Sequence, residues 1–277
     1  MTISKFLLDE VWPRHFASVR FANLNKFLVQ LGLRGLGVMN WRTPQESGEE
    51  WLVSTFLRQR FAGRNRPVIV DVGAHFGESA GEFRRVFSDA RIVAAEPSPT
   101  AFALARERLT SADVEMHQTA LSDEAGSVEL FDYEAKSAGS QHASIFEDVF
   151  RLGKKDAKWT PVSVVATTLD LLCAQSQIER VDFLKIDTEG CEFKVLKGAT
   201  GLLARGAIDV IQFEFNEMNV FSRVFMADFF GLLPGYALYR LLPSGLLPLN
   251  PHWQLGANFF AFQNIVAIRK SDETSTG

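Results

Sequence analysis

Four acidic residues stand at the carboxyl ends of short apolar runs: Asp71, Glu96, Asp187 and Glu214. Runs of this kind are typical of buried strands in a parallel sheet. In open α/β sheets the ligand binds outside the carboxyl ends of the strands, so we expect the four carboxylates on one rim. Such a rim favours a ligand that carries several hydroxyls or a positive charge.

Glu96 has the most defined chemistry of the four. An acid at the end of the second strand of a nucleotide-binding sheet accepts hydrogen bonds from both hydroxyls of a ribose. Pro97 follows Glu96 and ends the strand, because proline cannot donate to the hydrogen-bond ladder. The pair therefore predicts a ligand that contains a nucleoside.

The turn after the first strand narrows the choice of ligand. It carries Gly73 and Gly77, whereas a pyrophosphate-binding turn has the pattern Gly-x-Gly-x-x-Gly, in which the second glycine lets the backbone approach the phosphates. His75 stands in place of that glycine, the turn contains no lysine, and Asp71 precedes it. An acid beside the turn repels a pyrophosphate but suits a cationic amino acid end. S-Adenosylmethionine, with a ribose, an amino group and a sulfonium, is the expected cofactor.

Strands that alternate with helical segments must bring these residues together. The predicted strands are residues 67–72, 91–96, 114–121, 181–187, 208–215, 236–241 and 258–268. The alternation predicts an α/β fold with a doubly wound, largely parallel sheet. Residues 128–133 and 162–167 are expected to pair as an added ribbon. The polar stretch between them, which contains His142, is expected to be a functional or disordered loop.

The composition is that of a globular protein with a large core. Of the 277 residues 47% are hydrophobic, and the net charge of −4 argues against a nucleic-acid-binding protein, which usually carries a basic patch. Cys173 and Cys191 have neither metal-site nor disulfide spacing and are expected to be reduced and buried. No apolar run is long enough for a secretory signal or a transmembrane segment, which predicts a cytoplasmic protein.

The N-terminal segment has a different character. Residues 5–36 carry apolar side chains at mostly helical spacing, with basic residues between them. A basic amphipathic helix can lie on a membrane or bind a partner. We favour packing against the domain or a second subunit, and hence a homodimer through the N-terminal helices. We therefore divide the chain into a helical extension (1–46), a main domain (47–270) and a disordered tail (271–277).

Several motifs together resemble the FkbM family of S-adenosylmethionine-dependent methyltransferases. The matching segments are Val70–Gly77, Ala95–Pro97, Ala120–Asp123, Thr168–Asp170, Leu184–Gly190, Val195–Ala199, Phe213–Phe215 and Asn264–Ala267. The most specific of them is the Lys-Ile-Asp-x-Glu-Gly block at residues 185–190, placed at this distance after the glycine turn. The resemblance covers the main domain and leaves only the N-terminal segment outside.

The resemblance implies a class I methyltransferase fold, a Rossmann-like seven-stranded sheet whose last strand is antiparallel. It also implies methyl transfer to a hydroxyl, often of a sugar or a polyketide-like natural product. The chain departs from the family at His75, where Asn is more usual. That change leaves backbone contacts intact but puts a side-chain contact in doubt.

On this basis we expect three groups of residues to bind three different parts of the cofactor. The glycine turn and the acid before it hold the methionine end, the acid of the second strand and its proline hold the ribose, and a Ser-Asp pair holds the adenine edge. The expected cofactor-binding residues are Asp71, Gly73, Ala74, His75, Gly77, Glu96, Pro97, Ser122, Asp123 and Asp187.

The chemistry is expected at the other end of the rim. Asp187 and Glu189 should lie beside the transferred methyl group and the acceptor, with Glu214 and His142 as the remaining candidates for the general base. Asp187, Glu189 and Glu214 have the oxygen ligands that Mg²⁺ prefers, so a metal-assisted route is an open alternative, although no metal site is assigned.

Two other classes of protein share this type of sheet. A nicotinamide-dependent oxidoreductase needs the middle glycine that this turn lacks. A non-catalytic nucleotide-binding module has no need of acids at the strand ends, which are present here. The motif series therefore favours the methyltransferase.

Overall fold

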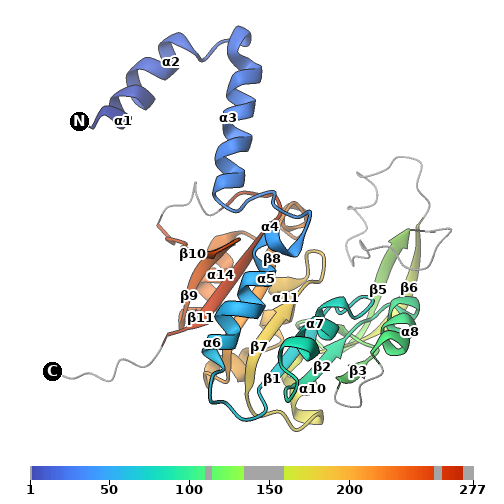
Figure 1. The fold of residues 1–277 in the computed structure, drawn as a ribbon. Helices are drawn as coiled ribbons and strands as arrows, with labels where there is room; N and C mark the ends of the chain where they lie inside the picture. The colour runs from blue at the N-terminus through green and yellow to red at the C-terminus, as the bar shows by residue number, and fades with distance from the viewer. Residues whose placement is uncertain (1, 110–113, 134–158, 253–257, 271–277) are drawn as a thin grey trace.

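The computed structural model describes residues 2–109, 114–133, 159–252 and 258–270, and an eight-stranded sheet forms its centre (Figure 1). Five neighbouring strands, in the order β3-β2-β1-β7-β8, are parallel. They are β1 (Val68–Val72), β2 (Arg91–Ala95), β3 (Val114–His117), β7 (Val181–Ile186) and β8 (Ile208–Phe215). Their apolar runs are continuous because both faces are covered: Val70 packs into one core cluster and Ile69 into the other.

The other side of the sheet is antiparallel. The last strand, β11 (Gln263–Arg269), lies between β8 and β9 (Tyr236–Leu242) and is antiparallel to both, as the resemblance implied. A short strand, β10 (Gly245–Pro248), forms a hairpin with β9 and adds an eighth strand to the expected seven.

Helices cover both faces, which confirms the doubly wound architecture. One face carries α10 (Leu169–Gln175), α11 (Glu192–Lys197), α12 (Thr200–Ala204) and α14 (Met226–Leu232). The other carries α5 (Glu49–Trp51), which continues into the π-helix η3 (Leu52–Leu57), and α7 (Glu78–Val86). The described residues also form the helices α4 (Pro44–Ser47), α6 (Arg58–Arg60), α8 (Pro99–Arg108) and α13 (Met218–Ser222).

A second, three-stranded sheet consists of β4 (Ala120–Leu121), β6 (Trp159–Thr167) and β5 (Gly126–Tyr133). The antiparallel pair β5–β6 is the predicted ribbon. The prediction of one strand over residues 114–121 is wrong, because the chain leaves the main sheet at His117. The Thr119 hydroxyl donates to the Val165 carbonyl (3.1 Å) and the Ser122 amide to the Thr167 carbonyl (2.9 Å), so this segment pairs with β6 instead of β2.

The N-terminal segment stands away from the main domain (Figure 1). It contains α1 (Ile3–Phe6), the π-helix η1 (Leu7–Val11), α2 (Trp12–His15), the short 3₁₀ turn η2 (Val19–Phe21) and α3 (Ala22–Gly35). None of these elements has a buried residue, so the expected packing against the domain is wrong. No helix among the described residues is long and apolar enough to span a membrane.

Candidate functional site

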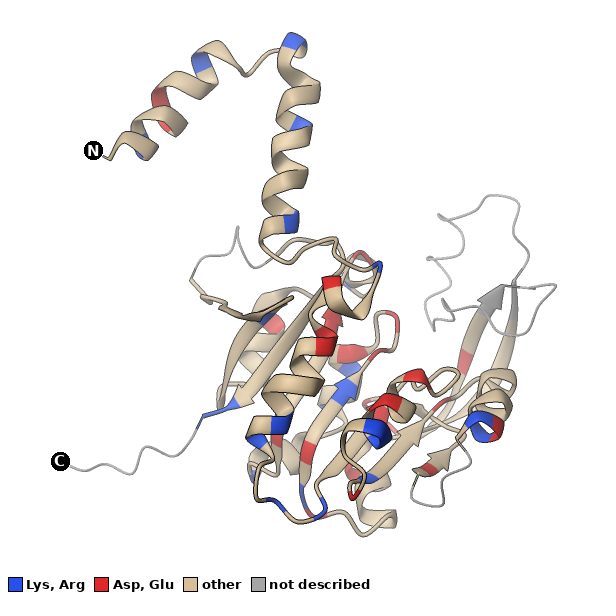
Figure 2. Cartoon of the chain, in the orientation of Figure 1, with Lys and Arg blue, Asp and Glu red and all other residues tan. Residues whose placement is uncertain are grey.

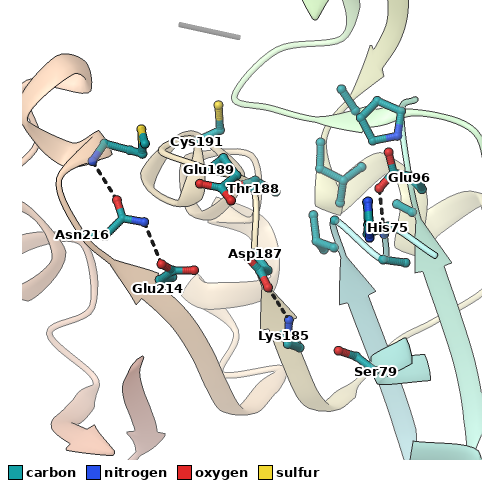
Figure 3. A pocket seen from close by; sticks show the side chains of 18 of the residues that line it. His75, Ser79, Glu96, Lys185, Asp187, Thr188, Glu189, Cys191, Glu214 and Asn216 are labelled. Carbon is teal, nitrogen blue, oxygen red and sulfur yellow. Dashed lines mark hydrogen bonds and ion pairs between the residues drawn. The ribbon is translucent and has the colours of Figure 1, made fainter. Parts of the chain in front are cut away.

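A cavity of about 970 Å³ lies at the carboxyl ends of β1, β2, β7 and β8. Three of the four strand-terminal acids, Glu96, Asp187 and Glu214, line it, as does Glu189. The ligand-binding rim expected from the sequence is therefore present. In Figure 3, Asp187 lies between Glu214 on one side and His75 with Glu96 on the other.

The glycine turn forms the wall of the cavity above β1. Gly73 has φ +83°, and a Cβ atom on it would lie 1.8 Å from the Asp187 carbonyl oxygen. Only glycine permits this approach, which fixes the turn against the segment that carries Asp187. His75 also has a positive φ of 49°. His and Asn enter this region more readily than most residues, so His75 replaces the usual Asn without backbone strain.

Glu96 is held in place by backbone amides. Its Oε2 accepts from the His75 amide and its Oε1 from the Ser98 amide, both at 2.8 Å. The carboxylate is almost fully buried and lines the cavity. Because each carboxylate oxygen has a second lone pair, Glu96 can still accept from a ligand diol.

Asp71 lies beneath the cavity and is fully buried. It does not belong to the cavity lining. The Ala80 amide, in the first turn of α7, lowers the pKa of Asp71. Within the described residues, however, neither Asp71 oxygen has a partner that meets the geometry of a hydrogen bond. Burial raises the pKa of Asp71 to about 6, and the neighbouring Lys185 opposes this effect.

Lys185 and Asp187 form an ion pair at the end of β7. Lys185 Nζ is 2.8 Å from Asp187 Oδ2, and Lys185 is buried. Burial alone would lower the pKa of Lys185, but the charges of Asp187, Asp71 and Glu49 raise it, so the ammonium persists. Burial alone would likewise raise the pKa of Asp187, but Lys185 lowers it. The result is a charged carboxylate that lines the cavity.

Glu214 differs from Asp187 although both line the cavity. Burial, together with the charges of Asp187 and Glu189, raises the pKa of Glu214 well above its ordinary value. Asn216 Nδ2 donates to Glu214 Oε1 at 2.7 Å. The Glu214 carboxyl therefore holds its proton more tightly than Asp187 does, and its hydrogen bonding stabilises the Asp187 carboxylate.

Glu192, which was not predicted from the sequence, supports the segment after Asp187. Its Oε1 accepts from the Thr188 amide (2.9 Å), the Thr188 hydroxyl (3.1 Å) and the Gly190 amide (3.1 Å). Burial raises the pKa of Glu192 to about 7. Between these amides Glu189 adopts φ 51° and lines the cavity. The only sequence signal for Glu192 was its position two residues after Gly190.

The two residues that were expected to bind the adenine, Ser122 and Asp123, differ in their position relative to the cavity. Ser122 lines the cavity together with Leu121 and Leu130. Asp123 is not among the lining residues. The ammonium of Lys197 lies 3.0 Å from its Oδ2, and the Ser122 hydroxyl donates to its Oδ1 at 3.0 Å. The structure therefore brings Ser122, but not Asp123, to the cavity.

Residues from outside the predicted site close the opposite end of the cavity. Met39 and Trp41 come from the segment after α3, and Phe260 and Phe262 from the segment before β11. The Met39 amide donates to the Phe262 carbonyl at 2.8 Å, which ties the two segments together. No sequence pattern indicated this contact, because the two segments are more than two hundred residues apart.

Two further predictions concern His142 and a metal. His142 lies outside the described residues, as do residues 271–277. Among the residues that the structure describes, no three His, Cys, Asp or Glu side chains are grouped closely enough to hold a metal ion. Cys173 and Cys191 are both buried, as expected.

The fold and the acid-lined cavity define a class I, Rossmann-like methyltransferase that uses S-adenosylmethionine. The model of the FkbM methyltransferase domain matches residues 71–237. This chain therefore belongs to the FkbM methyltransferase family. The match confirms the resemblance that the motif series indicated.

Two curated relatives are methyltransferases. The 2-O-methyltransferase NoeI of Sinorhizobium fredii is 27% identical over 186 residues, which cover 64% of this chain and 72% of NoeI. The methyltransferase sdnD of Sordaria araneosa is 28% identical over 157 residues, which cover 48% of this chain and 61% of sdnD.

Among solved structures, the plantazolicin methyltransferase BpumL in complex with SAH is 11% identical, with a TM-score of 0.43 over 97% of this chain and 99% of that chain. The O-methyltransferase from Bacillus cereus in complex with SAH is 14% identical, with a TM-score of 0.40 over 95% of this chain and 97% of that chain.

Proposed function

We propose that the protein transfers a methyl group from S-adenosylmethionine to a hydroxyl of a sugar or natural-product acceptor, with Asp187 as the general base. The observation that supports the proposal most is a pair of cavity carboxyls whose pKa values shift in opposite directions: Lys185, 2.8 Å from Asp187, lowers that of Asp187, and burial raises that of Glu214. Nearby carboxyls whose environments separate their pKa values are typical of acid–base sites. The name of NoeI gives independent support for an oxygen acceptor.

The residues of the cavity fit the cofactor. Glu96 is positioned to accept from the ribose hydroxyls, and the backbone of the glycine turn faces the same space. Lys185 and His75 are the only Lys, Arg or His residues that line the described cavity, and Lys185 is already paired with Asp187. A pyrophosphate would therefore lack cationic partners, whereas a ligand with an ammonium and a sulfonium suits the acidic wall. This argues against the nicotinamide cofactor that was the sequence-based alternative.

When bound, the cofactor supplies a methyl group on a sulfonium, which reacts with an oxygen nucleophile. An alcohol is a poor nucleophile and benefits from a base within hydrogen-bond reach. Asp187 is the cavity carboxylate that Lys185 keeps charged, so it accepts the hydroxyl proton. Glu214, whose pKa is raised, holds the proton of the pair and donates a hydrogen bond that keeps the negative charge on Asp187. Glu189 and the Glu192-supported loop orient the acceptor beside them.

The acceptor binds at the end of the cavity formed by Met39, Trp41, Phe260 and Phe262. Exposed aromatic rings offer flat apolar surface for stacking, which suits the face of a sugar ring or of an aromatic natural product. In this position the hydroxyl of the acceptor lies next to Asp187 and Glu214. The cytoplasmic location and the homodimer expected from the sequence stay predictions.

The test uses cofactor labelled with tritium in its methyl group and a panel of oligosaccharides and phenolic natural products. We expect label in a product that resists mild base, because a methyl ether survives treatment that releases methanol from a methyl ester. Asp187→Asn should lower turnover by about 100-fold or more, since it removes the base. Cofactor affinity, measured by calorimetry with S-adenosylhomocysteine, should change far less.

Glu217→Gln is the matched control, since Glu217 is an exposed carboxylate that lines the same cavity. It should keep wild-type turnover. If Asp187→Asn retained the wild-type rate, Asp187 would not be the base. Base-labile label would indicate a carboxylate acceptor in place of a hydroxyl.

A further inference from the structure

The charges of the chain are strongly segregated. Residues 11–45 contain five basic residues, Arg14, Arg20, Lys26, Arg34 and Arg42, and no acidic residue. Because the whole chain carries −4, the remaining residues carry −9. Figure 2 shows the consequence: basic residues are spaced along the N-terminal helices, and most acidic residues lie on the main domain.

The helix α3 adds an apolar stripe to this charge. Leu24, Phe27, Leu28 and Leu31 recur at the spacing of one helix face. They are between 38% and 58% exposed. Lys26 lies on the side of the helix away from this stripe, and Arg34 lies at the edge of the stripe next to Phe27. An exposed apolar stripe on a helix that carries basic and no acidic residues is typical of segments that lie in a membrane interface.

Contacts at the junction between α2 and α3 hold these two helices in one arrangement. Trp12 and Phe16 stack with ring centroids 4.5 Å apart, and Trp12 Nε1 donates to Asn25 Oδ1 at 3.0 Å. Asn25 Nδ2 in turn donates to the Phe16 carbonyl at 2.9 Å. The helices before and after the junction are thus joined as one unit, which lowers the entropy cost of docking.

The root of the segment is attached to the main domain. Gly37 has φ +82°, and a Cβ atom on it would lie 2.7 Å from the Leu241 carbonyl oxygen. Two residues later, the Met39 amide donates to the Phe262 carbonyl. The C-terminal end of α3 is therefore anchored near the end of the cavity that Met39 and Trp41 line.

We propose that residues 11–42 bind the surface of an anionic lipid bilayer, with the stripe of α3 in the interface and the basic side chains at the head groups. The five cations, of which Arg14 also pairs with Glu10 (2.6 Å), are complementary to such a surface. A second copy fits less well, because pairing two of these segments brings ten positive charges together. The exposed apolar residues of the main domain, such as Leu104, Leu171 and Val220, lie on separate helices and offer no matching groove.

The test is flotation of the full chain with vesicles of phosphatidylcholine and phosphatidylglycerol, compared with vesicles of phosphatidylcholine alone. We expect binding to the anionic vesicles that weakens with added salt. Lys26→Gln with Arg34→Gln should lower the partition coefficient by about 30-fold, since each cation near an anionic surface contributes about fivefold. The control, Arg58→Gln with Arg205→Gln, removes the same charge from exposed positions of the main domain and should bind like the wild type.

A second pair of variants tests the stripe. Phe27→Ser with Leu31→Ser should lower binding by about tenfold or more per residue, because the buried apolar area is lost. Leu104→Ser with Leu171→Ser should have no effect. Thermal shifts caused by S-adenosylhomocysteine should be equal in all variants, which shows that the main domain is folded. Absence of binding, equal binding to both kinds of vesicle, or a wild-type dimer that the Phe27 and Leu31 changes convert to a monomer would overturn the proposal.

Discussion

At the scale of single residues, position relative to one lysine separates the roles of the acids. Asp187 contacts the buried ammonium of Lys185, which lowers its pKa, whereas Glu214 lacks such a cation in the described structure and burial raises its pKa. Asp71, fully buried below them, has its pKa raised to about 6. Three acids at strand ends therefore have three different pKa values, although the sequence places them in similar positions. The difference comes from burial and from distance to one cation.

Glu192 should make the stability of the protein depend on pH near neutrality. Its pKa is about 7 in the folded protein, above its ordinary value of 4.5, so the folded state binds the proton more tightly than the unfolded state. Its contribution is complete below the unfolded pKa and is lost as the pH rises towards 7 and beyond, at a cost of about 3 kcal/mol. In Glu192→Gln, whose amide oxygen can accept the same three hydrogen bonds, this contribution is independent of pH.

Urea unfolding of both proteins at pH 5 and pH 8 measures the effect. The free energy of unfolding of the variant, relative to that of the wild type, should rise between the two pH values. A difference between the two proteins that is the same at both pH values would show that Glu192 is ionised throughout.

At the scale of elements, the site depends on how closely two strand ends approach. The turn after β1 and the segment after β7 meet at Gly73, where there is no room for a side chain between backbone atoms. The parallel pairing of β1 with β7, from Ile69 with Phe183 to Val72 with Ile186, fixes this contact. The cofactor turn and the proposed base are therefore parts of one rigid unit.

Gly73→Ala should disrupt that unit. The new Cβ would lie 1.8 Å from the Asp187 carbonyl oxygen at a φ of +83°, so backbone must move. We expect a loss of about 2–4 kcal/mol in the free energy of unfolding and a large loss of S-adenosylhomocysteine affinity.

Gly81→Ala is the control for this substitution. Gly81 lies within α7, where a Cβ atom would have only an ordinary contact of 3.7 Å with Leu109. This variant should be neutral or up to about 1 kcal/mol more stable, because alanine is the better helix former. Equal effects of the two substitutions on unfolding would contradict the account of the turn.

At the scale of the whole molecule, two segments that are far apart in the sequence meet at the cavity. The segment after α3 supplies Met39 and Trp41, and the segment before β11 supplies Phe260 and Phe262. The N-terminal helices are thus continuous with the proposed acceptor end, while the cofactor end belongs to the parallel strands. Within the predicted extension, Gly37 and Val38 are buried, and Gly37 lies against the Leu241 carbonyl of the main domain.

Trp41→Ala should weaken binding of the acceptor without affecting binding of the cofactor. Because Trp41 lies at the acceptor end and is 62% exposed, its loss should raise the KM for the acceptor about tenfold and leave kcat and cofactor affinity unchanged. Steady-state kinetics and calorimetry measure the two effects. Phe6→Ala, an exposed aromatic residue far along the N-terminal segment, is the control. A loss of cofactor affinity as large as the rise in KM would contradict the placement of Trp41 at the acceptor end.

The sequence alone determined the sheet, the acids at its rim and the family, because these depend on local patterns: apolar runs, breaks at Gly and Pro, and short motifs such as residues 185–190. The glycine turn and Glu96 were found where they were predicted to lie. Only the tertiary structure decided which acids are charged, since the pKa of Asp187 depends on burial and on contact with Lys185. It also placed Asp123 beside Lys197, Asp71 below the cavity and Trp41 within it. These are contacts between distant segments, and no local pattern encodes them.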